Sequence, residues 1–186
     1  NFNYKENKDN NYINYVTIQK STFANNSANK YGGAIYADRF SRVTIVDTNF
    51  TNNTAGTNGG AIYNQSGTIT LNNATFDDNG AATYGGAIYN SNGTSTINMN
   101  GVTFEAPTGT NKNDIYNEGT INVTDGTNTF ASAVTNGGTM NVQGGTNTIS
   151  GAITNSNIVN VTGGTNTFSG DITTTGDMNF GGTNTI

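Results

Sequence analysis

The 186-residue chain contains no cysteine, no histidine, no tryptophan and a single proline. Without cysteine there is no disulfide pattern from which a redox compartment can be read. Without histidine the chain has no histidine general base, no histidine metal ligand and no Ser–His pair. These absences remove the commonest catalytic and metal-binding chemistries. We expect no catalytic residues, no metal site and no cofactor.

Charge is also scarce, and it is uneven. Charged residues make up 10% of the chain, the formal net charge is −5, and all seven lysines and arginines lie at or before Lys112. Nucleic-acid binding requires clustered cations that neutralise phosphates, so no nucleic-acid partner is expected. An anionic membrane surface would repel the chain, and no apolar run approaches the roughly 20 residues that span a bilayer. No direct membrane insertion of this segment is expected.

What the sequence does contain is a repeat whose length changes partway along the chain. A period of 26 to 28 residues gives way to one of 19 residues, and a fixed period of this size predicts a solenoid. The longer period is marked by Phe23, Phe50, Phe76 and Phe104, and the shorter by Val123, Val142, Val161 and Phe180. We therefore divide the chain into a polar arm or partial cap (1–13), a wide-coil part (14–118) and a narrow-coil part (119–186).

Residues 68–93 show how one unit is expected to fold. Residues 68–71 alternate polar and apolar side chains, and two further short strands are expected at 74–76 and 85–89. Asn- and Gly-rich bends separate these strands, and both residue types tolerate the positive φ of tight corners. Three short strands per coil and about seven coils predict an all-β fold, a single parallel β-helix (β-solenoid).

Stacked coils would align like residues in columns. Three apolar columns are expected inside: Ile18, Ile45, Leu71, Met99, Val123, Val142, Val161, Phe180; Phe23, Phe50, Phe76, Phe104, Phe130, Ile149, Phe168; and Ile35, Ile62, Ile88, Ile115, Val134, Ile153, Ile172. Asn26, Asn53 and Asn79 recur three residues after the phenylalanines. They form either simple turns or an interior ladder of side-chain amides, and we favour the ladder.

Two motifs occur together in the wide-coil part. Residues 23–26, 50–53 and 76–79 read FxxN, and residues 32–35, 59–62 and 85–88 read GGAI. Paired FxxN and GGAI repeats resemble those of the polymorphic outer membrane proteins of chlamydiae, which are autotransporters. The resemblance covers roughly residues 14–104 and implies a passenger-like, right-handed parallel β-helix at the bacterial cell surface. The chain departs from that family in having no cysteine and no C-terminal membrane barrel.

Carboxylates are candidates for glycoside cleavage because many β-helices degrade polysaccharides. Asp77 and Asp78 are adjacent on a bend, and Glu105 follows about one coil later. Acid–base cleavage needs two carboxylates at a set separation, one with a raised pKa, and the pattern shows neither. We expect solvated bend residues, with calcium on Asp77 and Asp78 as the open alternative. The protein is expected not to be an enzyme.

Two outward-facing rows are candidate binding surfaces. The first is Tyr36, Tyr63, Tyr89 and Tyr116, and the second is the Thr-x-Thr grid of Thr127, Thr129, Thr146, Thr148, Thr165 and Thr167. An exposed tyrosine row binds sugars or proteins, but rings stacked from coil to coil would serve only to cover the sheet. The threonine grid resembles those of β-solenoid ice-binding proteins, although threonine also simply suits exposed strands.

We therefore expect a non-enzymatic, extracellular structural or adhesive protein of the bacterial cell surface. Its partner would be a protein or glycan on a host or neighbouring cell. Two alternatives stay open. One is a self-assembling extracellular fibre, because the sequence stops in mid-repeat at Ile186 and open coil ends pair readily. The other is an ice-binding protein that uses the threonine grid.

Overall fold

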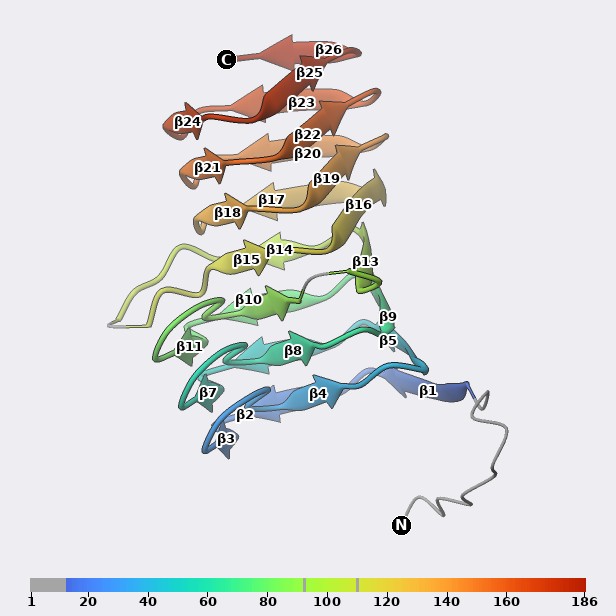
Figure 1. Cartoon of the computed structure of the whole chain (residues 1–186), viewed down its shortest axis with the longest axis vertical. Helices are drawn as coiled ribbons and strands as arrows, with labels where there is room; N and C mark the ends of the chain where they lie inside the picture. Colours follow the sequence, from blue (N-terminus) through green and yellow to red (C-terminus); the bar gives the residue numbers. More distant parts are fainter. Residues whose placement is uncertain (1–12, 92, 110) are drawn as a thin grey trace.

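The computed structural model describes residues 13–91, 93–109 and 111–186. These residues form 26 β-strands, and the chain winds upward from the first coil to the last as a single stack (Figure 1). Every pairing between strands is parallel and joins equivalent residues of successive coils. The predicted all-β parallel solenoid is confirmed. The polar arm predicted at 1–13 lies, except for Ile13, outside the described residues.

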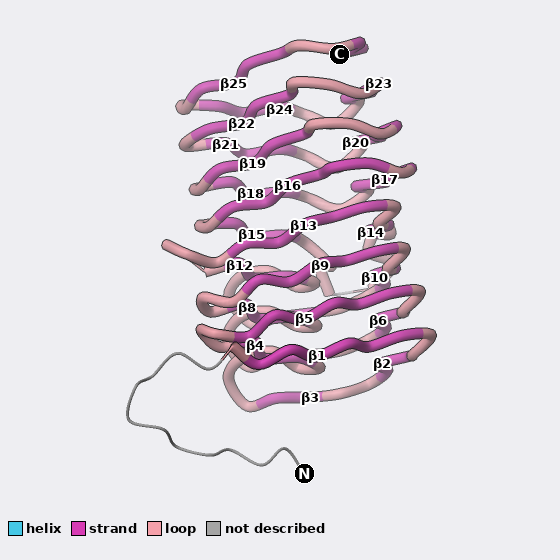
Figure 2. Tube along the Cα trace, turned by 90° about the vertical axis from the view of Figure 1, so that its right-hand side faces the viewer, coloured by secondary structure: helices cyan, strands magenta, loops and turns pink. Residues whose placement is uncertain are grey.

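Two eight-stranded sheets run the length of the stack. The first, which faces the viewer in Figure 2, is called the long sheet. It consists of β1 (Asn14–Gln19), β5 (Ser41–Val46), β9 (Thr68–Asn72), β13 (Thr96–Asn100), β16 (Thr120–Asp125), β19 (Thr139–Val142), β22 (Ile158–Val161) and β25 (Asp177–Phe180). The second, the Phe sheet, consists of β2 (Thr22–Ala24), β6 (Asn49–Thr51), β10 (Thr75–Asp77), β14 (Thr103–Phe104), β17 (Thr127–Phe130), β20 (Thr146–Ile149), β23 (Thr165–Phe168) and β26 (Thr183–Thr185).

A seven-stranded sheet and a three-stranded sheet complete the coils. The Ile sheet consists of β4 (Ile35–Ala37), β8 (Ile62–Asn64), β12 (Ile88–Asn90), β15 (Ile115–Asn117), β18 (Val134–Asn136), β21 (Ile153–Asn155) and β24 (Ile172–Thr174). The short sheet consists of β3 (Ser27–Ala28), β7 (Thr54–Ala55) and β11 (Gly80–Ala81). The narrow coils have the three predicted strands, whereas three wide coils carry this fourth, two-residue strand. Two residues are too few to show an alternating pattern in the sequence.

The three predicted apolar columns are confirmed by the strand register. Ile45 pairs with Ile18 and Leu71, Phe76 with Phe50 and Phe104, and Ile88 with Ile62 and Ile115. Their members are buried in the inner coils. The long sheet adds a fourth column that was not predicted from the sequence, and it lies inside because residues two apart on one strand share a face. This column is Val16, Val43, Ile69, Ile97, Ile121, Met140, Val159 and Met178.

Asparagine side chains form hydrogen-bonded ladders inside the stack. The predicted ladder is confirmed: Asn26 Nδ2 donates to Asn53 Oδ1 at 2.8 Å, and Asn53 Nδ2 donates to Asn79 Oδ1 at 2.9 Å. It continues through Asn79 to Asn113, at 3.1 Å, across an interval of 34 residues. Further ladders run along Asn64, Asn90, Asn117, Asn136, Asn155; Asn128, Asn147, Asn166, Asn184; and, on the outer face, Asn98, Asn122, Asn141, Asn160, Asn179.

Asn90→Leu is expected to destabilise the stack although the replacement is apolar and similar in size. Asn90 is fully buried, and its Nδ2 donates to Asn117 Oδ1 at 2.8 Å and to the Thr120 carbonyl at 3.1 Å. The substitution leaves the buried Asn117 oxygen without its donor, which costs about 1–3 kcal/mol. Urea unfolding of the variant measures this loss. Asn179→Ala, at an exposed ladder position, is the control and should stay within about 0.5 kcal/mol of wild type; equal stability of both variants would contradict the prediction.

Candidate binding surfaces

The four tyrosines predicted as a row occupy the middle positions of β4, β8, β12 and β15. They lie in register, and their rings stack with centroid distances of 5.3, 5.1 and 5.4 Å and interplanar angles of 1°, 5° and 3°. Adjacent parallel strands are about 4.8 Å apart, so identical residues at one register position bring their rings into contact. The coil-to-coil ring stacking considered for Tyr36, Tyr63, Tyr89 and Tyr116 is therefore present.

Two further tyrosines lean over this stack and were not predicted from the sequence. The Tyr31 ring lies 4.7 Å from that of Tyr63, and the Tyr84 ring lies 4.4 Å from that of Tyr116, both tilted by about 30°. The repeated hexapeptide YGGAIY, at 31–36 and again at 84–89, is the signal that marks them. We call the six residues the tyrosine corner: Tyr31, Tyr36, Tyr63, Tyr84, Tyr89 and Tyr116.

The first glycine of each GGAI motif makes this overlay geometrically feasible. Gly32, Gly59 and Gly85 have φ of +62°, +68° and +66°, the left-handed region in which residues with a Cβ are strained. The bends that precede β4, β8 and β12 thereby turn sharply before the strand begins. In the middle coil Asn58 takes the position held by Tyr31 and Tyr84, and its buried side-chain oxygen has no hydrogen-bond partner among the described residues.

The tyrosine corner is not uniformly exposed. Tyr31, Tyr36 and Tyr84 are 39%, 48% and 47% exposed, whereas Tyr89 is only 9% exposed. The Tyr89 hydroxyl donates to Glu118 Oε2 at 2.5 Å, and the Tyr36 hydroxyl bonds to Gln65 Oε1. The corner therefore presents three accessible rings on a base of stacked, hydrogen-bonded ones.

The same burial alters the acid–base behaviour of the four stacked rings. Desolvation raises the pKa of Tyr36, Tyr63, Tyr89 and Tyr116 above the ordinary tyrosine value. The shift is largest for Tyr89, where the hydrogen bond to Glu118 and the negative charge of its carboxylate also raise the pKa.

Alkaline pH is expected to destabilise the fold through these rings. The unfolded chain loses phenolic protons near pH 10, while the folded chain keeps them, so the stabilisation is present below about pH 10 and is lost as pH rises through the folded pKa values. The urea concentration at the unfolding midpoint should be lower when measured above about pH 10 than when measured below it. Tyr89→Phe removes the most shifted phenol and should show a shallower fall, and a pH-independent wild-type midpoint would contradict the prediction.

The predicted threonine grid lies on the outer face of the Phe sheet. Thr127, Thr146 and Thr165 pair in register, as do Thr129, Thr148 and Thr167, and the asparagine between each pair points inward. One column is longer than predicted and follows the sheet through all its coils, with Asn49 as its one exception. It consists of Thr22, Asn49, Thr75, Thr103, Thr129, Thr148, Thr167 and Thr185.

Of the two carboxylates on the third FxxN bend, Asp78 has a structural contact. The Asp78 side chain accepts hydrogen bonds from the backbone N–H (2.9 Å) and the hydroxyl of Thr108, which lower its pKa. Asn111 Nδ2 donates to the Asp78 carbonyl at 2.7 Å, so Asp78 helps to hold the segment between β14 and β15. The described residues contain no group of three or more acidic, histidine or cysteine side chains placed to hold a metal ion. Nor do they include a helix long and apolar enough to cross a membrane.

Comparison with known families finds one repeat family, which matches the chain at three places. The Chlamydia polymorphic membrane protein repeat matches residues 20–38, 47–65 and 73–91. Each match begins at a left-handed corner residue (Lys20, Asp47 or Asn73) and covers strands of the Phe, short and Ile sheets, with the FxxN asparagine and the stacked tyrosine inside it. No curated protein and no solved structure matches the chain. Three segments of the chain are thus similar to the polymorphic membrane protein repeat.

Proposed function

We propose, from three polymorphic membrane protein repeats set in a parallel β-solenoid, that the chain is a non-enzymatic structural and adhesive segment of a bacterial cell-surface protein. Residue ladders and in-register pairing run along the whole stack, as expected of a scaffold that holds a surface in place. The family name describes membrane proteins of Chlamydia, which supports a location in the bacterial cell envelope. The proposed partner is a protein or glycan of a host or neighbouring cell.

The observation that carries this proposal is the tyrosine corner. Its accessible rings are Tyr31, Tyr36 and Tyr84. The rings of Tyr31 and Tyr84 pack against stacked rings, with centroid distances of 4.7 and 4.4 Å. Tyrosine offers a large apolar face, a hydroxyl and few rotatable bonds, so a fixed tyrosine binds at a low entropic cost. Held at fixed positions on two coils that one further coil separates, the three rings form a preorganised surface for contact with another molecule.

Adhesion of chain-coated beads to a cultured epithelial monolayer tests the proposal. The double variant Tyr31→Ala/Tyr84→Ala removes two accessible rings from the bends and leaves the stacked column in place. We expect bead binding to fall at least about tenfold, as for hot-spot aromatic residues. Thr146→Ser/Thr165→Ser changes an exposed face of a different sheet and should bind like wild type. Wild-type beads that bind no better than uncoated beads, or a tyrosine variant that binds normally, would refute the proposal.

Ice binding is the second candidate, and the in-register threonine grid favours it. Thr127, Thr146 and Thr165 are exposed beside the longer column through Thr148 and Thr167. The spacing of such a grid is about 4.8 Å between coils and about 7 Å along a strand. Thermal hysteresis of the purified chain tests this candidate, with Thr146→Tyr as the variant that breaks the flat face. Absence of hysteresis in the wild type would eliminate it.

A further inference from the structure

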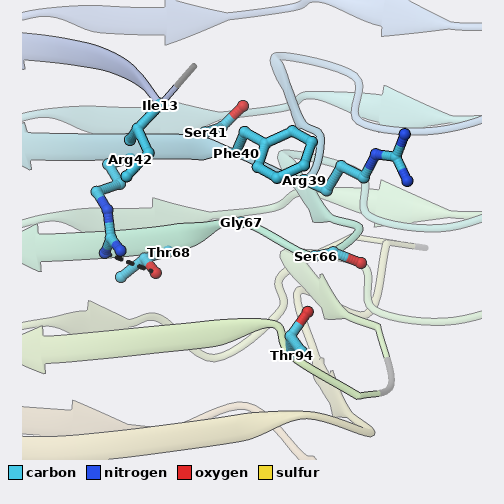
Figure 3. Close-up of a pocket in the computed structure, with 9 residues that line it drawn as sticks. All are labelled: Ile13, Arg39, Phe40, Ser41, Arg42, Ser66, Gly67, Thr68 and Thr94. Carbon is cyan, nitrogen blue, oxygen red and sulfur yellow. Dashed lines mark hydrogen bonds between the residues drawn. The ribbon is translucent and has the colours of Figure 1, made fainter. Parts of the chain in front are cut away.

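A groove lies at the turns that follow β4, β8 and β12, where the chain passes from the Ile sheet into the long sheet (Figure 3). It has a volume of about 390 Å³ and is formed by the turns of successive coils. Its walls and floor come from residues 39–42, 66–68 and 94, with Ile13 at one edge. The groove belongs to none of the surfaces that the repeat pattern predicted.

Two arginines line this groove in a chain that is otherwise poor in cations. Arg42 faces outward on β5, and its Nη1 donates to Thr68 Oγ1 at 3.4 Å. The Arg39 guanidinium lies 5.2 Å from the centre of the Phe40 ring. Figure 3 shows the two guanidiniums on either side of that ring. No ion pair joins either arginine to a carboxylate within the described ranges, and the Asp38 carboxylate accepts from the backbone N–H of Arg39 instead, at 2.7 Å.

An aromatic ring and hydroxyl groups complete the groove. Phe40 is 39% exposed and has a φ of +69°, a conformation that is unusual for a bulky residue and that persists only where the surroundings impose it. Ser66 and Thr94 supply hydroxyls on the side away from Arg42, and Gly67 lines the groove between Thr68 and Ser66. The groove therefore offers an apolar face, flanking positive charges and hydrogen-bonding hydroxyls.

We propose that this groove binds an acidic saccharide, one that carries a carboxylate or a sulfate. A sugar ring stacks on the exposed face of Phe40, the anionic group pairs with the Arg39 and Arg42 guanidiniums, and the ring hydroxyls bond to Ser66 and Thr94. Guanidinium forks match planar carboxylate and sulfate oxygens better than ammonium groups do. Tyr15, which is 75% exposed and pairs in register with Arg42, extends the aromatic surface for a second sugar unit.

Calorimetric titration of the whole chain with defined oligosaccharides tests the inference. The probes are trigalacturonic acid and sialyllactose for the carboxylate, a chondroitin sulfate disaccharide for the sulfate, and galactotriose and lactose as neutral counterparts. We expect at least one acidic probe to bind with a Kd of about 1 mM or tighter, and the neutral counterparts to bind at least about tenfold more weakly. The comparison between carboxylated and sulfated probes identifies the preferred anion.

Charge-neutralising variants decide whether the groove is the site. Arg39→Gln and Arg42→Gln should each weaken binding of the acidic probe at least about fivefold, and Phe40→Gly should weaken it without altering net charge. Lys30→Gln removes the same charge beside the tyrosine corner and should leave binding unchanged. No acidic probe bound by the wild type, equal binding of neutral probes, or equal losses in Lys30→Gln and the arginine variants would overturn the inference. The tyrosine-corner variants should bind these probes normally, so the adhesion proposal stands or falls separately.

Discussion

Ile88→Asp is expected to abolish cooperative folding of the chain. Ile88 is fully buried and pairs in register with Ile62 on one side and Ile115 on the other. An aspartate there either carries an unpaired charge into a dry interior or must be protonated, and both cost free energy. It also removes an apolar side chain that the coils above and below contact. We expect a loss of about 4 kcal/mol or more, the range reached by charge burial in a core.

Circular dichroism and thermal unfolding measure this effect directly. Thr146→Ser is the control, because Thr146 is exposed on the Phe sheet and its replacement should stay within about 0.5 kcal/mol of wild type. A β-rich spectrum and a wild-type Tm in Ile88→Asp would show that the Ile column does not face the interior. Because each coil contacts only its neighbours, a partial loss of ellipticity would report local unraveling rather than an intact stack.

Gly60→Ala is expected to be strongly disruptive although it adds a single methyl group. Gly60 is the second glycine of its GGAI motif, and a Cβ there would overlap the carbonyl oxygens of Gly86 and Gly80 in the next coil. Those atoms belong to the backbone, so no side chain can rotate away to make room. Overpacking of this kind costs about 1–3 kcal/mol and sometimes more, and here we expect the upper end.

Gly109→Ala is the matched control for that substitution. Gly109 lies in the segment between β14 and β15, a Cβ added to it would meet no described atom within 4 Å, and its φ is not left-handed. Its replacement should leave the urea midpoint unchanged or slightly raised, since alanine restricts the unfolded chain. If Gly60→Ala and Gly109→Ala unfold at the same urea concentration, close stacking of the GGAI bends is not what requires glycine at position 60.

Positions that recur at a fixed interval were predictable from the sequence. The columns through Ile45, Phe76 and Ile88 and the ladder through Asn53 follow from one condition, that equivalent residues of successive coils lie directly above one another. The ladder's next member, Asn113, was not predictable, because the segment after β14 lengthens the interval and hides the period. The short sheet was not predicted either, because its two-residue strands are too short to show a periodic pattern.

The candidate surfaces also combine features that the sequence predicts with features that depend on the folded structure. The outward direction of Thr146 and Thr148 follows from strand alternation, but the stacking of Tyr84 on Tyr116 depends on how a bend folds back over the sheet. The exposure of the tyrosines also varies from coil to coil, from 9% at Tyr89 to 48% at Tyr36, although their sequence contexts are nearly identical. Exposure depends on what covers a residue, which a local motif does not contain.

The order of amino acids was enough to specify the solenoid, its two coil lengths and three of the apolar columns that line its interior, because a periodic chain can bury its apolar side chains only by stacking like on like. The groove that would hold a ligand, in contrast, is a product of the folded stack. Arg42, Gly67 and Thr94 are 25 or more residues apart and share no motif. They meet because the turns of successive coils are held one strand spacing apart, and that proximity exists only once the coils have stacked.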